Sequence, residues 1–154
     1  MRPDEARTFL EIHARSIRGL AANHYSPEVI DGWAAQITDE SIQRFLKNSD
    51  SEIRLLGELN GEVVGLGALV VQKNELRACY VIPEVARRGV GTALVTEIER
   101  IAKARGLTRL DLESSINAEP FYAALGYTVV GRGEHVFRSG IRMAAARMRK
   151  VIGN

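Results

Sequence analysis

The stretch 81-VIPEVARRGVGTAL-94 decides how the chain is organised, because a strand-like apolar run changes there into a helical pattern. The run ends at Pro83, and a helix begins near Gly89 after two arginines. A helix N-terminus leaves several backbone N–H groups unpaired and carries roughly half a positive charge. Glycines at Gly89 and Gly91 allow a ligand to approach those groups without a Cβ in the way. The turn therefore predicts a phosphate or pyrophosphate site, with a plain strand–helix turn and solvated arginines as the alternative.

Two common nucleotide-binding motifs do not fit this turn. The sequence has no Gly-Lys-Ser/Thr, which excludes a Walker P-loop. The segment "GVGTAL" lacks the third glycine of a dinucleotide fingerprint, and it follows the third strand of a predicted meander rather than the first strand of a βαβ unit.

The segments on either side show helical spacing or strand-like runs of apolar residues. Helices are expected from Asp4 to Ala22, from an N-cap at Ser26 to Gln36, from Asp39 to Lys47, from Gly89 to Arg105 and over "EPFYAALG" (119–126). Strands are expected on both sides of Asn60-Gly61, over "ELRACYVI" (75–82), over "RLDLES" (109–114) and on both sides of Ser139-Gly140. This order predicts a mixed α/β sheet with helices on both faces.

The composition indicates one ordinary globular domain over residues 1–154, with 45% hydrophobic residues. A net charge of +2, from 21 basic and 19 acidic residues, does not indicate a nucleic-acid partner. The single cysteine, Cys79, excludes an internal disulfide and a cysteine zinc cluster, and no metal site is predicted. The charged N-terminus is unlike a signal peptide, and no apolar run reaches the roughly 20 residues of a membrane span. We therefore expect a soluble cytoplasmic protein.

Two segments resemble the signatures of the GNAT N-acetyltransferases. "RRGVGTAL" after a strand ending in "YVIP" is similar to the acyl-CoA-binding turn of that family, and "INAEPFYAALGY" (116–127) is similar to its second signature. The resemblance covers roughly Glu52 to Lys150. It implies a mainly antiparallel mixed sheet of about six to seven strands. The chain departs from the family at Ala86, where Gln or Arg is usual, and only "MRP" is left for the family's first strand.

The resemblance also implies where acetyl-CoA would bind. In the family the pantetheine arm lies between two strands that separate, so that Tyr80 and Val81 would bond the arm and the acetyl carbonyl. The pyrophosphate would be held by backbone N–H groups of Arg87, Arg88, Gly89, Val90, Gly91 and Thr92. Asn117 matches the family's asparagine and would bond the pantetheine arm, or else cap the helix that follows it.

Two residues are candidates for acid–base chemistry. The resemblance places Tyr122 near the sulfur of the cofactor, where a phenol with a pKa of roughly 10 can protonate the leaving thiolate. In the alternative, Phe121 and Tyr122 cap the core, because adjacent helix residues point about 100° apart and are not expected to share one pocket. Glu75 matches a position where some family members carry a general base, although it also reads as an exposed residue at a hairpin end.

Other polar and aromatic residues are weaker candidates for a functional role. His24, Tyr25 and Trp33 lie where the family often lines its acceptor pocket, and each also has a structural interpretation. His13 falls on the apolar stripe of the first helix and is expected to be a buried, hydrogen-bonded histidine. His135 lies near the last hairpin. Cys79 is expected to alternate with Tyr80 across the sheet as an inert thiol.

Three functions remain open from the sequence. The resemblance favours an enzyme that transfers an acetyl group from acetyl-CoA to an amine by direct transfer in a ternary complex. A non-catalytic acyl-CoA-binding sensor and a nucleic-acid binder are the alternatives. The acceptor, whether a small amine, an amino acid, an antibiotic or a peptide N-terminus, and the state as monomer or homodimer are left undetermined.

Overall fold

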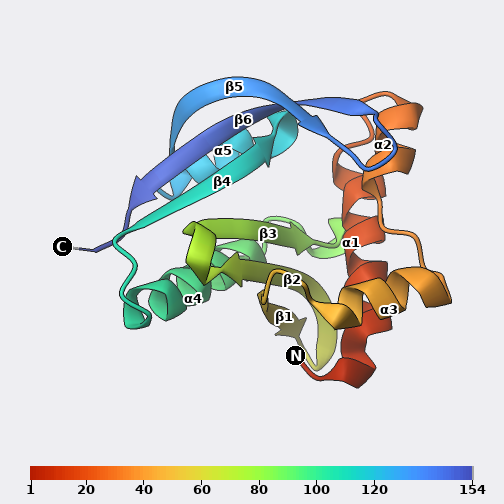
Figure 1. The fold of residues 1–154 in the computed structure, drawn as a ribbon, viewed down its shortest axis with the longest axis horizontal. Helices are drawn as coiled ribbons and strands as arrows, with labels where there is room; N and C mark the ends of the chain where they lie inside the picture. Colours follow the sequence, from red (N-terminus) through yellow and green to blue (C-terminus); the bar gives the residue numbers. More distant parts are fainter. Residues whose placement is uncertain (154) are drawn as a thin grey trace.

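A computed structural model describes residues 1–153 and contains one six-stranded sheet with the order β1-β2-β3-β4-β6-β5 (Figure 1). The strands are β1 (Ile53–Leu59), β2 (Glu62–Val70), β3 (Glu75–Val81), β4 (Arg109–Ser115), β5 (Thr128–Val136) and β6 (Arg142–Val151). The α-helices are α1 (Ala6–Leu20), α2 (Pro27–Trp33), α3 (Asp39–Lys47), α4 (Val90–Ala104) and α5 (Glu119–Ala124). Every neighbouring pair is antiparallel except β3 and β4. The predicted mixed, mainly antiparallel α/β fold is confirmed.

The N-terminal third differs from the expectation at two places. Among residues 1–153 no strand precedes α1, because Pro3–Glu5 forms a 3₁₀ turn that leads directly into the helix. The second helix ends at Trp33 rather than at Gln36. It stops there because the backbone N–H of Ala35 donates to His13 Nδ1 at 3.1 Å instead of continuing the helical pattern.

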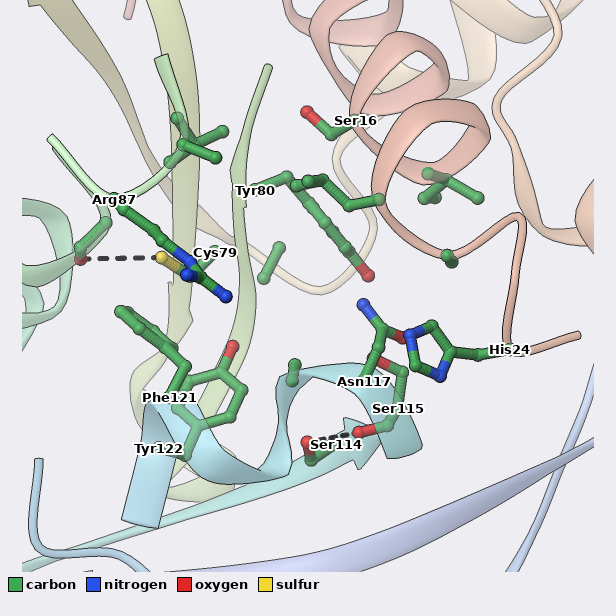
Figure 2. Close-up of a pocket in the computed structure, with 18 of the residues that line it drawn as sticks. Ser16, His24, Cys79, Tyr80, Arg87, Ser114, Ser115, Asn117, Phe121 and Tyr122 are labelled. Atoms are coloured by element: carbon green, nitrogen blue, oxygen red, sulfur yellow. Dashed lines mark hydrogen bonds between the residues drawn. The ribbon is translucent and has the colours of Figure 1, made fainter. Parts of the chain in front are cut away.

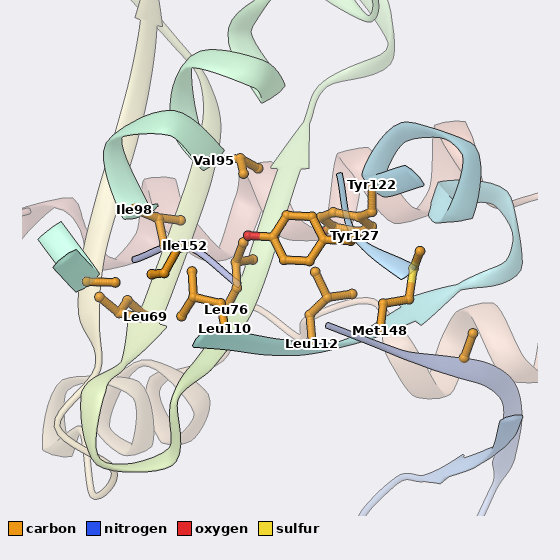
Figure 3. Close-up of a cluster of buried hydrophobic side chains, with 12 residues drawn as sticks. Leu69, Leu76, Val95, Ile98, Leu110, Leu112, Tyr122, Tyr127, Met148 and Ile152 are labelled. Atoms are coloured by element: carbon orange, nitrogen blue, oxygen red, sulfur yellow. The ribbon is translucent and has the colours of Figure 1, made fainter. Parts of the chain in front are cut away.

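One hydrophobic core joins α4 and α5 to the sheet (Figure 3). Its largest members are Leu69, Leu76, Val95, Ile98, Leu110, Leu112, Tyr122, Tyr127, Met148 and Ile152. Helix α4 lies close to β2 because Gly67 has no side chain. A Cβ at Gly67 would be 2.8 Å from Ile98 Cδ1. This close packing fixes α4, and with it the turn that precedes its N-terminus, against the sheet.

The sheet opens between β3 and β4. These two strands are paired at one position only, Glu75 with Asp111, whereas β4 pairs with β6 along its whole length. Past the single pair, the edge of β3 that faces β4 has no strand partner, as Figure 1 shows. The gap that the resemblance implies is therefore present in the fold.

The C-terminal end of α1 lies against the end of β3. A Cβ built on Gly19 would be 2.0 Å from Cγ of Pro83, which means that the helix backbone touches the proline ring. Since Pro83 lies two residues after the end of β3 and begins the turn to α4, this contact sets the distance between α1 and the sheet opening.

We expect Gly19→Ala to destabilise the protein, although alanine is the better helix former. Helix propensity alone would stabilise the variant by about 1 kcal/mol. The overlap with Pro83 forces a backbone shift whose cost lies at the upper end of the usual range of about 1–3 kcal/mol, so the net change should be a loss of about 1–2 kcal/mol. Urea unfolding of the variant and the wild type measures this difference in the free energy of unfolding. Gly133→Ala is the control, because a Cβ there meets nothing within 4 Å. Equal stability of the Gly19→Ala variant and the wild type would contradict the close contact.

Candidate functional site

A cavity of about 570 Å³ occupies the sheet opening (Figure 2). It is lined by the C-terminal part of α1, by residues 77–81 of β3, by the turn that leads into α4, and by residues of β4 and α5. The volume is in the range of small-molecule sites. The cavity brings together the two sequence signatures, which are separated by about one helix and one strand in the chain.

The turn before α4 presents unpaired donors and unneutralised charge. Gly89 is the N-cap, its φ is +87°, and no side chain caps the helix. The first N–H groups of the helix, at Val90–Thr92, have no intrahelical acceptor. Arg87 lines the large cavity and Arg88 lines a smaller one beside β1, and neither forms an ion pair within residues 1–153. These features suit an anion with several oxygen atoms.

Asn117 carries a buried acceptor that lacks a partner. Its side chain lines the cavity (Figure 2), and no donor in the described part of the chain reaches its Oδ1. It does not cap α5, because Ala118 is the N-cap and makes no side-chain hydrogen bond. An unsatisfied buried acceptor costs about 1–3 kcal/mol, which an amide N–H from a ligand would recover.

Phe121 and Tyr122 both line the cavity, so the expectation that neighbouring helix residues would not share one pocket is wrong. A Cβ on Gly91 would be 3.1 Å from Cζ of Phe121, so that ring covers the start of α4. The hydroxyl of Tyr122 points into the opening (Figure 2) and bonds to no side chain or backbone group of residues 1–153. Burial raises the pKa of Tyr122 well above its usual value of 10.

Neighbouring residues of β3 face opposite sides of the sheet, as the alternation predicts. Tyr80 faces α1 and α2, and its hydroxyl accepts a hydrogen bond from Trp33 Nε1 at 3.3 Å. Cys79 faces α4, with its Sγ 3.6 Å from the carbonyl oxygen of Gly91. Burial raises the pKa of both the Tyr80 phenol and the Cys79 thiol to about 12. Cys79 therefore stays a neutral, unreactive thiol at physiological pH.

The three residues expected at the acceptor end have different positions. Trp33 and His24 line the cavity. Tyr25 is not among the lining residues: its hydroxyl accepts from the N–H of Ile116 at 2.8 Å and donates to the carbonyl of Ala144 at 2.7 Å. With both hydrogen bonds made inside the protein, Tyr25 joins the loop after α1 to the ends of β4 and β6.

Glu75 does not reach the cavity. It begins β3, and six residues of strand place it about 20 Å from Val81. Its Oε1 is 2.8 Å from Nη2 of Arg77, within an ion-pair network that includes Asp50 and Glu52. These contacts give Glu75 a structural role.

Glu113 of β4 lines the cavity instead and is the residue that the sequence reasoning missed. Its Oε1 lies 2.6 Å from Nδ1 of His135, which connects that histidine to the site. The alternation in "RLDLES" places Glu113 on the opposite face from Leu110 and Leu112. The sequence does not reveal which of the two faces borders the opening.

His13 has the structural role that its position in the first helix predicts. Besides accepting from the N–H of Ala35, its ring packs edge-to-face on Tyr80 with 4.9 Å between ring centroids. Desolvation lowers the pKa of His13 to about 4. The imidazole is therefore neutral at pH 7 and holds the chain after α2 against α1.

Within residues 1–153, no three His, Cys, Asp or Glu side chains are grouped so that they could hold a metal ion. None of the helices in the same residues combines the length and the apolarity that crossing a membrane requires.

Comparisons with known proteins agree with the two signatures. The model of the family described as Acetyltransferase (GNAT) domain matches residues 21–151. A crystal structure described as "GCN5-Related N-acetyltransferase: Aminotransferase, Class-II" from Rhodopseudomonas palustris is 31% identical, with a TM-score of 0.88 over 98% of this chain and 92% of that chain. The uncharacterized N-acetyltransferase YafP of Escherichia coli K12 is 27% identical over 128 residues, 83% of this chain and 78% of that protein. The PaiA N-acetyltransferase of Thermoplasma acidophilum, solved with coenzyme A, has the same fold, with 22% identity and a TM-score of 0.75 over 98% and 95% of the two chains.

We expect the stability of the protein to fall between pH 6.5 and pH 4 because of His13. In the unfolded chain the histidine takes up a proton below its ordinary pKa of 6.5, whereas the folded protein resists protonation down to about pH 4. The free energy of unfolding should therefore fall by roughly 3 kcal/mol over this interval.

The measurement is urea unfolding at several pH values, and His13→Asn is the comparison. The amide oxygen of asparagine can still accept from the N–H of Ala35 but does not titrate. The variant should lose less stability than the wild type as the pH falls, and parallel curves would show that His13 does not cause the loss.

Proposed function

The chain belongs to the GNAT family of acetyltransferases, and on this premise we propose that the cavity at the sheet opening transfers an acetyl group directly from acetyl-CoA to an amine. The observation that carries the proposal is the separation of β3 and β4 beside a helix start with free N–H groups. An extended ligand with a pyrophosphate at one end matches both features. The complex of the T. acidophilum relative with coenzyme A supports this assignment.

The residues around the opening fit such a cosubstrate. The N–H groups at the start of α4 and the guanidinium of Arg87 would hold the pyrophosphate. The unpaired Oδ1 of Asn117 would accept from an amide N–H of the pantetheine arm. The free edge of β3 at Tyr80 and Val81 would pair with the same arm, in the way that a strand adds to a sheet edge.

The reaction requires that the acceptor nitrogen attack the carbonyl carbon of the thioester while the carbon–sulfur bond breaks. The negative charge on the carbonyl oxygen needs a donor, which a backbone N–H at Tyr80 or Val81 would supply. The acetyl group then ends on the nitrogen and the electron pair of the broken bond ends on the sulfur. Tyr122, whose hydroxyl is otherwise unbonded, would give its proton to that sulfur.

Burial makes this proton transfer reasonable even though Tyr122 is a weak acid. In water, a phenol with a raised pKa would not readily protonate a thiolate whose conjugate acid has a pKa of about 8.5. The Cys79 thiol, buried in the same opening, has its pKa raised to about 12. A coenzyme thiolate formed beside it would be a stronger base than in water for the same reason. The pKa values of the phenol and of the coenzyme thiol would therefore both be raised and would stay close to each other.

The binding half of the proposal is tested by calorimetric titration with acetyl-CoA, with NADH and ATP as controls. We expect acetyl-CoA to bind and Gly89→Val to raise its Kd by about 100-fold or more, equivalent to about 2.7 kcal/mol. A side chain at Gly89 would project into the open space in front of the helix, where nothing lies within 4 Å. Gly61→Val is the matched control, because Gly61 also has a positive φ and open space but lies in the β1–β2 hairpin. Unchanged affinity in Gly89→Val would place the phosphate site elsewhere.

The chemical half is tested with Tyr122→Phe. We expect kcat to fall about 100-fold or more, because the thiolate loses its proton donor, while the affinity for acetyl-CoA stays nearly the same. Released thiol is measured with an amine that the wild type acetylates. Tyr127→Phe is the control, since Tyr127 is also buried but donates to Glu99 outside the cavity. If both variants turn over as fast as the wild type, Tyr122 is not the acid.

A further inference from the structure

The hydroxyl of Tyr25 lies where the ladder between β4 and β6 ends. The last residue pair of this ladder is Ser115 with Ala145, and the next pair in the same register would be Ile116 with Ala144. In an antiparallel ladder, every second opposed pair exchanges its backbone hydrogen bonds directly. Here the Tyr25 hydroxyl stands between the two groups: it accepts from the N–H of Ile116 at 2.8 Å and donates to the carbonyl oxygen of Ala144 at 2.7 Å. The phenol is thus a bridge at the first position where the strands no longer pair.

The same hydrogen bond caps the turn that carries Asn117. Ile116 is the first residue of a 3₁₀ turn that ends at Ala118, and the first N–H groups of a helical turn have no acceptor inside it. The N-cap Ser115 supplies no side-chain acceptor, and Tyr25 from the loop between α1 and α2 takes this role. Burial raises the pKa of Tyr25, so the hydroxyl keeps its proton at physiological pH and can accept and donate together. The backbone that leads into Asn117 is therefore held by a side chain from a distant part of the sequence.

The ring of Tyr25 also contacts the other side of the sheet opening. It packs edge-to-face on Trp33, with 5.8 Å between the ring centroids. Nε1 of Trp33 donates in turn to the hydroxyl of Tyr80 on β3. Tyr25 is thus connected to both strands that separate at the opening, although it is not itself among the residues that line the cavity.

We propose that Tyr25 is a positioning residue for acetyl-CoA, because its hydroxyl holds the 116–118 turn so that Oδ1 of Asn117 meets an amide N–H of the pantetheine arm. The inference rests on the proposed binding of acetyl-CoA at the sheet opening. Oδ1 has no partner within residues 1–153, so its place is set by the backbone that carries it (Figure 2). Without the hydroxyl, Ile116 and Ala144 can bond to each other directly. That bond would extend the β4–β6 ladder by one pair and turn Asn117 away from the arm.

Tyr25→Phe tests the assignment by calorimetric titration with acetyl-CoA, which needs no acceptor amine. The substitution removes the hydroxyl and keeps the ring against Trp33. We expect the Kd for acetyl-CoA to rise about tenfold, which corresponds to the loss of one hydrogen bond to the ligand. Tyr127→Phe is the matched control, because it removes a hydrogen-bonded hydroxyl that donates to Glu99 outside the cavity, and its Kd should equal that of the wild type.

A double-mutant cycle separates positioning from a general loss of structure. Asn117→Ala should also raise the Kd about tenfold. Adding Tyr25→Phe to Asn117→Ala should raise the Kd no further, because the hydroxyl acts through the side chain that is already missing. Effects that multiply to about 100-fold would show that Tyr25 acts independently of Asn117 and would overturn the assignment. An unchanged Kd in the single variant Tyr25→Phe would overturn it as well.

Failure of the wider function looks different from failure of this inference. A wild type that binds no acetyl-CoA would overturn the proposed binding and the inference with it. An unchanged Kd in Asn117→Ala would remove the contact between Asn117 and the pantetheine arm, and with it the role of Tyr25. A wild type that binds acetyl-CoA, with weaker binding in Asn117→Ala and equal binding in Tyr25→Phe, would overturn the inference alone.

Discussion

The separation of β3 from β4 after one residue pair is the constraint on which the rest of the structure depends. Two parallel strands that continued to pair would close the sheet and leave no cavity. On their far sides the two strands remain paired, β3 with β2 and β4 with β6. The packing of α4 on Gly67 and of α1 on Pro83 fixes the β3 side further. The opening is thus built into the sheet, and its free backbone groups are complementary to an amide-containing arm.

Burial in the opening also determines which of its side chains carry a charge. Tyr80, Tyr122 and Cys79 all have raised pKa values because the opening is desolvated, so none of them carries a charge at physiological pH. Formal charge on the cavity lining comes from Arg87 at the α4 turn, from Glu113 of β4 and from Arg77 of β3, which is ion-paired with Asp50 and Glu75. A neutral centre beside the cationic α4 turn suits a ligand that has phosphates at one end and an uncharged arm next to them.

Much of the fold and the conformation of the turn before α4 could be predicted because their signals are local in the sequence. Asn60-Gly61 forms the expected hairpin, and "RRGVGTAL" forms the expected strand–helix turn. Glu75 does not reach the cavity for a reason that a sequence does not show: it lies at the closed end of the sheet, where β3 pairs with β4, and Arg77 holds its carboxylate. Tyr25 does not line the cavity, because its hydroxyl bonds to Ile116 and Ala144, which are 91 and 119 residues away in the sequence.

The part of the cavity around Trp33 and Glu113 could not be predicted because it is assembled from three distant segments. The position of Trp33 depends on where α2 ends. That end depends in turn on the hydrogen bond from the N–H of Ala35 to His13. Whether Glu113 lines the cavity depends on which face of β4 borders the opening. The position of His135 depends on the register of the last hairpin. The cofactor end, by contrast, comes from two short signatures and one strand. Substitutions in α2 or the last hairpin can therefore reshape the acceptor end while the cofactor end stays intact, which explains how one scaffold can serve different amines.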